Sequence, residues 1–148
     1  MWHEYCSMFS MEPIFGKNDF SRPEPALILV GDDDTMFRNM LVQLLEEHGF
    51  QTLPAEDGAQ SVELAIEYLP ALVILDISMP KMDGYTALAR LRGNSRTREI
   101  PVIILTGAAD GLYKGLSAGL GAVDHVTKPF RPQDLLELVH HSLPGRGR

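Results

Sequence analysis

Five short apolar runs, spaced along the chain from residue 26 onward, constrain its fold more than any other feature of the sequence. They are ALILV at 26–30, FQTL at 50–53, ALVIL at 71–75, PVIIL at 101–105 and VDHVT at 123–127. The length and the Val, Ile and Leu content of the first, third and fourth runs are typical of strands that are buried on both faces. The second and fifth runs are more polar, which favours strands nearer to the edges of a sheet.

Between these runs, apolar residues recur at the i, i+3, i+4 spacing of amphipathic helices. The first segment carries Phe37, Met40, Leu41, Leu44 and Leu45, the second Val62, Ala65, Ile66 and Leu69, and the last Leu135, Leu136, Leu138 and Val139. Gly49 follows the first segment as a helix C-cap would. Five strands alternating with five helices predict an α/β fold, with a five-stranded, doubly wound parallel sheet and right-handed crossovers.

The domain organisation follows from length and local composition. A chain of 148 residues suits one ordinary domain. Residues 1–25 show no sustained period and contain three prolines, so we expect a flexible N-terminal arm there. The predicted domain spans residues 26–143, and residues 144–148 form a C-terminal tail.

Charge and hydropathy exclude several classes of protein. The formal net charge of -7 argues against a protein that binds nucleic acid by neutralising its backbone. The single cysteine, Cys6, excludes a scaffold held by internal disulfides. The apolar runs fall far short of the roughly 20 residues that span a bilayer. We therefore expect a soluble, cytoplasmic protein without membrane insertion or direct DNA binding.

Polar side chains follow four of the predicted strands. The first strand runs into Asp32, Asp33 and Asp34, the third ends at Asp76, the fourth at Thr106 and the fifth at Lys128. Ligands of such sheets bind at the carboxyl ends of the strands, near the point where the strand order reverses. A polar residue after one strand is ordinary punctuation, but four complementary groups at four strand ends indicate a site.

The chemistry of these groups narrows the purpose of the site. Three crowded carboxylates, Asp32, Asp33 and Asp76, either raise one pKa or recruit a cation. Hard oxygen ligands without histidine or cysteine favour Mg²⁺ over zinc. Lys128 and Thr106 offer a phosphoryl oxygen a positive charge and a hydrogen-bond donor. The sequence therefore predicts a site that holds a phosphoryl group on Asp76, with Asp76 as nucleophile.

At these residues the sequence resembles the receiver domain of two-component response regulators, over roughly residues 26–143. The matching segments are ILVGDDDTMFR, LVILDISMPKMDGY, PVIILTG and GAVDHVTKPF. The separations also agree with that family: 43 positions from Asp33 to Asp76, 30 from Asp76 to Thr106, and 22 from Thr106 to Lys128. Four ordered motifs at such separations form a specific signal, and the resemblance implies a flavodoxin-like fold of (βα)5 type.

The resemblance implies a role for each site residue. Asp76 becomes the phospho-acceptor, Asp32 and Asp33 become the acidic pair that holds Mg²⁺, and the Ser78 carbonyl joins the metal ligands. Thr106 is the switch hydroxyl and Lys128 pairs with the phosphoryl group. The Lys128–Pro129 peptide bond is expected to be cis.

The sequence departs from the family pattern at two positions of interest. Gly31 stands where an aliphatic residue usually ends the first strand, so we expect looser backbone beside Asp32. His125 occupies the position of the switch aromatic, three residues before Lys128; filling that slot is the favoured interpretation, and a pH-dependent switch is the alternative. The arginines around the end of the third helical segment are expected on a solvated face: Arg90, Arg92, Arg96 and Arg98.

The leading functional interpretation is a phosphorylation-dependent signalling switch rather than a turnover enzyme. By the resemblance, a sensor histidine kinase or a histidine phosphotransfer protein donates the phosphoryl group, and the receiver assists its own phosphorylation and dephosphorylation. Only PGRGR follows Leu143, so output is expected through contact with another protein, unless the chain is a fragment. The alternatives are a haloacid-dehalogenase-like phosphatase, which also uses an aspartate nucleophile, and a degenerate receiver that acts as a binding module.

Overall fold

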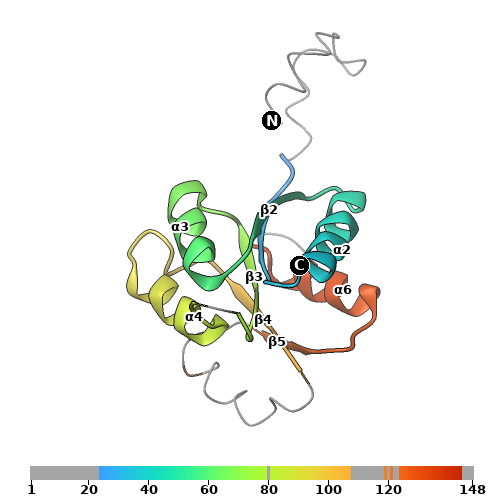
Figure 1. Cartoon of the computed structure of the whole chain (residues 1–148). Helices are drawn as coiled ribbons and strands as arrows, with labels where there is room; N and C mark the ends of the chain where they lie inside the picture. Colours follow the sequence, from blue (N-terminus) through green and yellow to red (C-terminus); the bar gives the residue numbers. More distant parts are fainter. Residues whose placement is uncertain (1–23, 80, 108–118, 120, 122–123, 145–148) are drawn as a thin grey trace, which may run out of the picture.

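The sheet has five parallel strands in the order β2-β1-β3-β4-β5 (Figure 1). The structure is a computed structural model that describes residues 24–79, 81–107, 119, 121 and 124–144. The strands are β1 (Leu27–Gly31), β2 (Gln51–Ala55), β3 (Leu72–Asp76), β4 (Val102–Thr106) and β5 (Asp124–Thr127). This order confirms the predicted parallel α/β fold, and it reverses between β1 and β3, where such sheets bind their ligands.

The polarity of each strand matches its place in the sheet. β3 and β4 are buried along their whole length, whereas β2 and β5 are partly exposed and lie at the two edges, as predicted. Pro54 is exposed and lies in edge strand β2, where its missing N–H does not interrupt the hydrogen bonds between the central strands. Each strand begins one residue later than its apolar run.

Four helices of the described chain cover the two faces of this sheet. They are α2 (Thr35–Glu47), α3 (Gly58–Tyr68), α4 (Gly84–Gly93) and α6 (Pro132–Ser142). Aspartates cap three of them, because the side chains of Asp34, Asp57 and Asp83 accept hydrogen bonds from first-turn amides. Apart from Gly119, the fourth predicted helix, between β4 and β5, lies outside the described residues. No described helix has the length and apolar character needed to cross a membrane.

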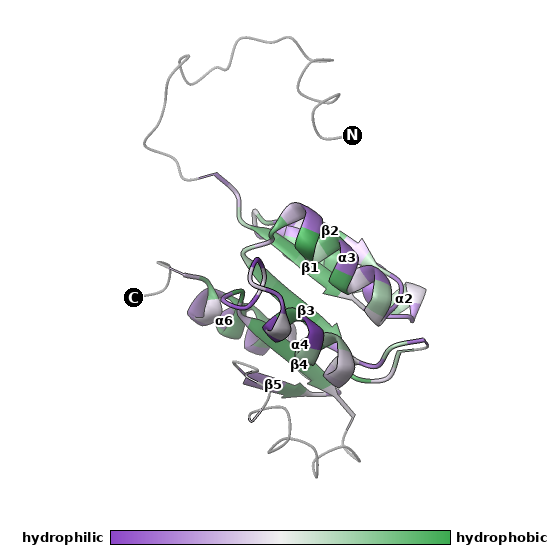
Figure 2. Ribbon diagram, turned by 90° about the vertical axis from the view of Figure 1, so that its left-hand side faces the viewer, coloured by the Kyte–Doolittle hydropathy of each residue, from purple (hydrophilic) through white to green (hydrophobic). Residues whose placement is uncertain are grey.

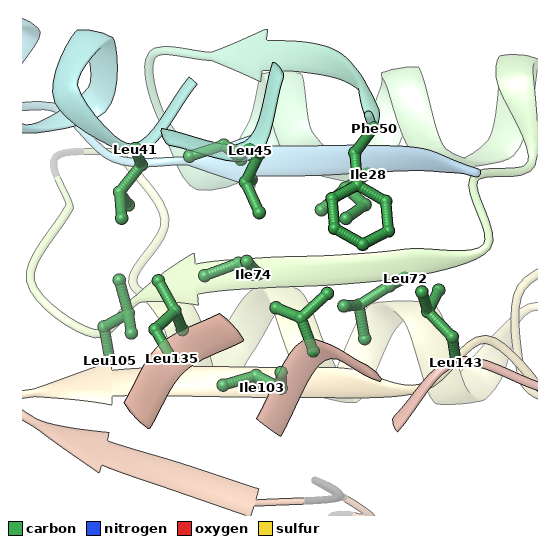
Figure 3. Close-up of a cluster of buried hydrophobic side chains, with 12 residues drawn as sticks. Ile28, Leu41, Leu45, Phe50, Leu72, Ile74, Ile103, Leu105, Leu135 and Leu143 are labelled. Atoms are coloured by element: carbon green, nitrogen blue, oxygen red, sulfur yellow. The ribbon is translucent and has the colours of Figure 1, made fainter. Parts of the chain in front are cut away.

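Two apolar clusters pack on the opposite faces of the sheet. α2 and α6 cover one face, and α3 and α4 cover the other (Figure 1). Figure 3 shows the first cluster, in which Leu41, Leu45 and Leu135 point from the helices toward side chains of the sheet. The central strands and the sheet-facing sides of the helices are the most hydrophobic parts of the ribbon (Figure 2). The packing therefore follows the predicted periodicity in its main features.

Two residues of the predicted apolar faces lie on the surface instead. Met40 in α2 is 48% exposed, and Leu69, just beyond α3, is 45% exposed. Leu69 ends α3 as its C-cap in the left-handed region, with φ of 49°, so the chain has already left the helix at that position. Gly49 does adopt a positive φ of 87° directly after the C-cap of α2, as predicted.

Gly31 allows close packing between β1 and α3. The residue is buried and paired in register with Ala55 and Leu75. A Cβ at this position would lie 2.4 Å from Oγ of Ser61 and 2.9 Å from a methyl group of Leu75. The expectation of looser backbone is therefore replaced by a steric reason, since β1 is paired on both sides here and only glycine leaves room for Ser61.

Arg92 departs from the expectation of a solvated face. Its half-buried guanidinium donates hydrogen bonds to the backbone carbonyls of Arg98, Ile100 and Gly121, at N···O distances from 2.7 to 3.3 Å. Burial lowers the pKa of this guanidinium from its usual value. Arg92 thus ties α4 to the segment before β4 and to the turn before β5. The other three arginines of the group are exposed, as expected.

Candidate functional site

Three carboxylates meet at the carboxyl edge of the sheet, beside the reversal in strand order. Asp76 is the last residue of β3, and Asp32 and Asp33 directly follow β1. One oxygen from each of the three lies within 4.8 Å of the others. Asp32 and Asp76 are buried, whereas Asp33 is exposed. The neighbouring, parallel strands β1 and β3 bring these carboxylates together, as the sequence predicts.

Asp32 is held by backbone and side-chain contacts from α2 and its cap. Its Oδ1 accepts a hydrogen bond from the amide of Asp34 (2.9 Å), and its backbone carbonyl accepts one from Nη1 of Arg38 (2.6 Å). Its backbone amide donates to the carbonyl of Ala55 in β2. Its Oδ2, although buried, accepts no hydrogen bond from the part of the chain that the structure describes.

Lys128, which directly follows β5, supplies a positive charge to this cluster. Its Nζ donates a hydrogen bond to Oδ1 of Asp76 (3.2 Å) and lies 3.6 Å from Oδ2 of Asp32. The backbone amide of Lys128 donates to the carbonyl of Thr106, which continues the pairing of β4 with β5 by one residue. The Lys128–Pro129 bond is cis, as predicted. One ammonium therefore faces two buried carboxylates.

Burial dominates the electrostatics of the two buried acids. Desolvation raises the pKa of Asp32 above its ordinary value of 3.8, and the charge of Asp76 raises it further. Desolvation likewise raises the pKa of Asp76, although Lys128 opposes this shift as an ion pair and a hydrogen-bond donor. The net effect is a site in which the carboxylates carry an unfavourable excess of negative charge, which a cation would relieve.

Thr106 and Ser78 lie on the strands and loop that border the carboxylates. Thr106 ends β4 and is fully buried, and its Oγ1 hydrogen bonds to no atom within the described ranges. Ser78 is exposed and lies two residues beyond Asp76 in the loop that leads to α4. The structure places both residues at the predicted edge of the sheet.

His125 is half-buried in edge strand β5, where it pairs in register with Ile104 of β4. Its side chain lines a groove of about 450 Å³ between β5 and α6, together with Phe130, Glu137 and His141 among others. His125 thus lies at the surface on edge strand β5, and Lys128 directly follows the end of that strand.

The loop after Asp76 packs tightly against its surroundings. The amide of Gly84 donates to the carbonyl of Ile77, and a Cβ at Gly84 would lie 2.5 Å from the backbone oxygen of Asp76. A Cβ at Gly58, at the start of α3, would likewise meet the carbonyl of Met82. Lys81 adopts a positive φ of 66° at the tip of this loop. These close approaches keep the segment that follows β3 beside the site.

Two residues of the site escaped the sequence analysis. Arg38 is 8% exposed and supports the backbone of Asp32. It shares the buried face of α2 with Leu41 and Leu45, so a charged residue at an apolar helical position was the available signal. Phe37 lies beneath Lys128, with its ring centroid 4.1 Å from Nζ. Its apolar periodicity gave no indication of this contact.

The donor set fits a hard divalent cation. Carboxylate oxygens are the ligands that Mg²⁺ takes in proteins, usually one or two together with water. Oδ2 of Asp32, which accepts no hydrogen bond from the described residues, and the exposed Asp33 leave ligand positions for the ion and its water. The ammonium of Lys128 and the hydroxyl of Thr106 add a cation and a donor at the same edge. Together these groups form an acidic site able to bind an anion through a metal and a lysine.

Comparison with known proteins identifies the family. Residues 28–140 match the response regulator receiver domain. The chain belongs to this family. Receiver domains are phosphorylation-dependent signalling switches of two-component systems, and they interact with histidine kinases or phosphotransfer proteins.

Individual relatives agree with this assignment. Protein PilH of Pseudomonas aeruginosa is 38% identical over 120 residues, which cover 81% of this chain and 99% of PilH. The DNA-binding dual master transcriptional regulator RpaA of Synechocystis is 38% identical over 112 residues, which cover 76% of this chain and 46% of RpaA, so the chain spans about half of that relative. The structure of Vibrio cholerae chemotaxis protein CheY4 superposes with a TM-score of 0.76 at 28% identity, covering 80% of this chain and 99% of CheY4.

Proposed function

We propose that Asp76 is the phospho-acceptor of this receiver, and that the donor is a phosphohistidine on a sensor histidine kinase or a histidine phosphotransfer protein. The observation that carries the proposal is the pairing of the buried Asp76 with Lys128 beside a second buried carboxylate, Asp32. Asp76 ends the strand next to the reversal in strand order, where a ligand of this fold binds. We further propose that the chain takes up one phosphoryl group and later loses it, without turnover of small substrates.

The chemistry requires an oxygen of Asp76 to attack the phosphorus of the donor. The P–N bond breaks, its electron pair leaves with the donor imidazole, and an acyl phosphate forms on Asp76. Lys128, already against Oδ1, compensates the charge that gathers on the phosphoryl oxygens. Hydrolysis then transfers the phosphoryl group to water and restores the carboxylate.

The residues that would hold Mg²⁺ are Asp32, Asp33 and Asp76, with the carbonyl of Ser78 as the further ligand that the family resemblance implies. When bound, the ion supplies positive charge to the phosphoryl oxygens during transfer. The carboxylates orient around that charge, and the excess negative charge of the unphosphorylated site is relieved. This accounts for a cluster that is electrostatically unfavourable without a cation.

Signalling would use the residues that border the acceptor on the β4 and β5 side. The buried Oγ1 of Thr106 has no hydrogen-bond partner in the described chain, which leaves its hydroxyl able to donate a hydrogen bond to a phosphoryl oxygen. We propose that this contact and the position of His125 report phosphorylation to the outer face by shifting a two-state equilibrium. Output then passes to another protein through that face, without direct contact of this domain with DNA.

The experiment that tests the proposal is phosphorylation by acetyl phosphate with Mg²⁺, read by intact mass. We expect one added phosphoryl group in the wild-type protein, and none without Mg²⁺ or in Asp76→Asn. Asp124→Asn is the matched control, because Asp124 is an exposed aspartate at the start of β5, whereas Lys128 follows the end of that strand. It should be labelled like the wild type.

A folded wild-type protein without an adduct would contradict the proposal once beryllofluoride, a stable phosphoryl mimic, also failed to bind. Beryllofluoride binding without an adduct would instead show that hydrolysis outpaces transfer. Repeated turnover of p-nitrophenyl phosphate would favour the phosphatase alternative. A label that persists in Asp76→Asn would move the acceptor to another residue.

A further inference from the structure

Phe37 contacts the lysine of the acceptor site with the face of its ring. The Nζ of Lys128 lies 4.1 Å from the ring centroid, within the range in which an aromatic face attracts a cation. The same Nζ lies 3.2 Å from Asp76 and 3.6 Å from Asp32. The ammonium is therefore bounded by two carboxylates and by one aromatic ring.

The ring itself is held in place by a second aromatic residue. Phe130 packs against Phe37 with a centroid separation of 5.9 Å and an interplanar angle of 81°, a T-shaped pair. Phe130 follows Lys128 by two residues, so Phe37 of α2 contacts the segment after β5 at two points. Both aromatic residues also pack at the margin of the apolar cluster beneath α2 and α6. This packing fixes the plane of the ring that faces the ammonium.

We propose that Phe37 is a positioning residue for phosphoryl transfer, which holds the ammonium of Lys128 over the acceptor oxygen of Asp76 by a cation–π contact. This inference rests on the proposed role of Asp76. A lysine carries four rotatable side-chain bonds, and its side chain here is 29% exposed. Without the ring, the ammonium must be ordered against Asp76 at each transfer event. With the ring, that ordering exists before the donor arrives.

The first test separates the ring from the bulk of the side chain. Phe37→Leu keeps an apolar residue but removes the π face, and Phe50→Leu is the matched control. Phe50 is 5% exposed in the same apolar cluster, where its ring packs at a tilt against His140. We expect Phe37→Leu to lower the rate constant of acetyl phosphate labelling by about threefold to tenfold, the range of a partly desolvated cation–π contact. Phe50→Leu should change the rate by less than about twofold, although this more deeply buried residue should lose at least as much stability.

The second test changes the charge distribution of the ring at nearly constant size. Phenylalanine at position 37 is replaced by its 4-fluoro, 3,5-difluoro and 3,4,5-trifluoro analogues, which weaken the negative face stepwise. We expect the logarithm of the labelling rate to fall steadily along this series. A flat series would show that the ring only fills space, and it would overturn the proposal even if Phe37→Leu were slow.

The third test does not depend on phosphorylation. The order of the Lys128 ammonium is measured by ¹⁵N relaxation of Nζ in the unphosphorylated, folded protein, for the wild type and for the same fluorinated series. Lower order with each fluorine supports the positioning role, and unchanged order refutes it. If the wild type accepts no phosphoryl group at all, the proposed function fails, and this measurement alone decides whether Phe37 positions Lys128.

Discussion

Burial and the neighbouring carboxylates disfavour the charge of Asp32, so we expect this residue to destabilise the metal-free protein. We predict that Asp32→Asn raises the free energy of unfolding by about 2 kcal/mol at pH 7.5 without Mg²⁺. The side chain is fully buried, and one of its oxygens lacks a hydrogen-bond partner within the described chain. An amide at this position keeps the oxygen that accepts from Asp34, and its nitrogen replaces the oxygen that lies 3.6 Å from Nζ of Lys128.

The magnitude follows from the charges around Asp32. At an effective dielectric constant of about 20, a carboxylate at the 4.8 Å limit that bounds the cluster repels Asp32 by about 3.5 kcal/mol, and Lys128 at 3.6 Å attracts it by about 4.6 kcal/mol. Two carboxylates repel, but the exposed Asp33 is screened by solvent to about half of that value. A net repulsion of about 0.6 kcal/mol remains. The buried oxygen that accepts no hydrogen bond within the described chain adds about 1–2 kcal/mol.

The assay is urea denaturation with EDTA, followed by circular dichroism at several pH values. Because burial raises the pKa of Asp32 above 3.8, the folded state takes up a proton on this residue before the unfolded state does. The advantage of Asp32→Asn is therefore full at neutral pH. It shrinks as the pH falls through the raised pKa toward 3.8, because the wild-type carboxyl group becomes neutral as well.

Two comparisons make this prediction sharp. Glu63→Gln, at an exposed position in α3, removes the same unit of charge away from the site and should leave the stability within about 0.5 kcal/mol of the wild type. Added Mg²⁺ should stabilise the wild type through preferential binding to the folded state, and it should stabilise Asp32→Asn much less. An Asp32→Asn variant that is no more stable than the wild type at pH 7.5 would refute the electrostatic reasoning.

Three further predictions concern packing and backbone geometry. Gly31→Ala should lower the free energy of unfolding by about 1–3 kcal/mol in denaturant melts, because the added Cβ would collide with Ser61. A second change, Ser61→Gly, should recover part of that loss, and the steric explanation would be wrong if it recovered none. Arg92→Ala should lower the free energy of unfolding by about 2 kcal/mol in the same melts, since three backbone carbonyls lose their hydrogen-bond donor. Its control, Arg90→Ala at an exposed position in the same helix, should lower it by less than about 0.5 kcal/mol. Lys81→Gly should raise thermal stability by roughly 1 kcal/mol by relieving the left-handed backbone, and a destabilised variant would indicate that the 3.7 Å ion pair of Lys81 with Asp57 outweighs that strain.

The sequence alone determined the fold and the composition of the carboxylate site. Apolar runs of about five residues separated by helical periods indicate a parallel α/β sheet, because the intervening helices cover both faces of such strands. Parallel strands deliver their carboxyl ends to one edge, so Asp33, Asp76 and Lys128 had to meet there. The polar character of the second and fifth runs likewise placed those strands at the edges of the sheet.

Tertiary structure decided the contacts that no local pattern encodes. Phe37 and Leu41 are equivalent in a helical period, yet one lies under the ammonium of Lys128 and the other lies in the core. Arg92 looks like a surface charge in the sequence, but the folded chain brings the carbonyl of Gly121 to its guanidinium across 29 residues. Gly31 predicts a loose backbone from the sequence alone, whereas the folded structure shows that Ser61 packs where a Cβ of residue 31 would lie. Sequence periodicity records which face of an element is apolar, whereas the partner that approaches that face is set only when the helices dock on the sheet.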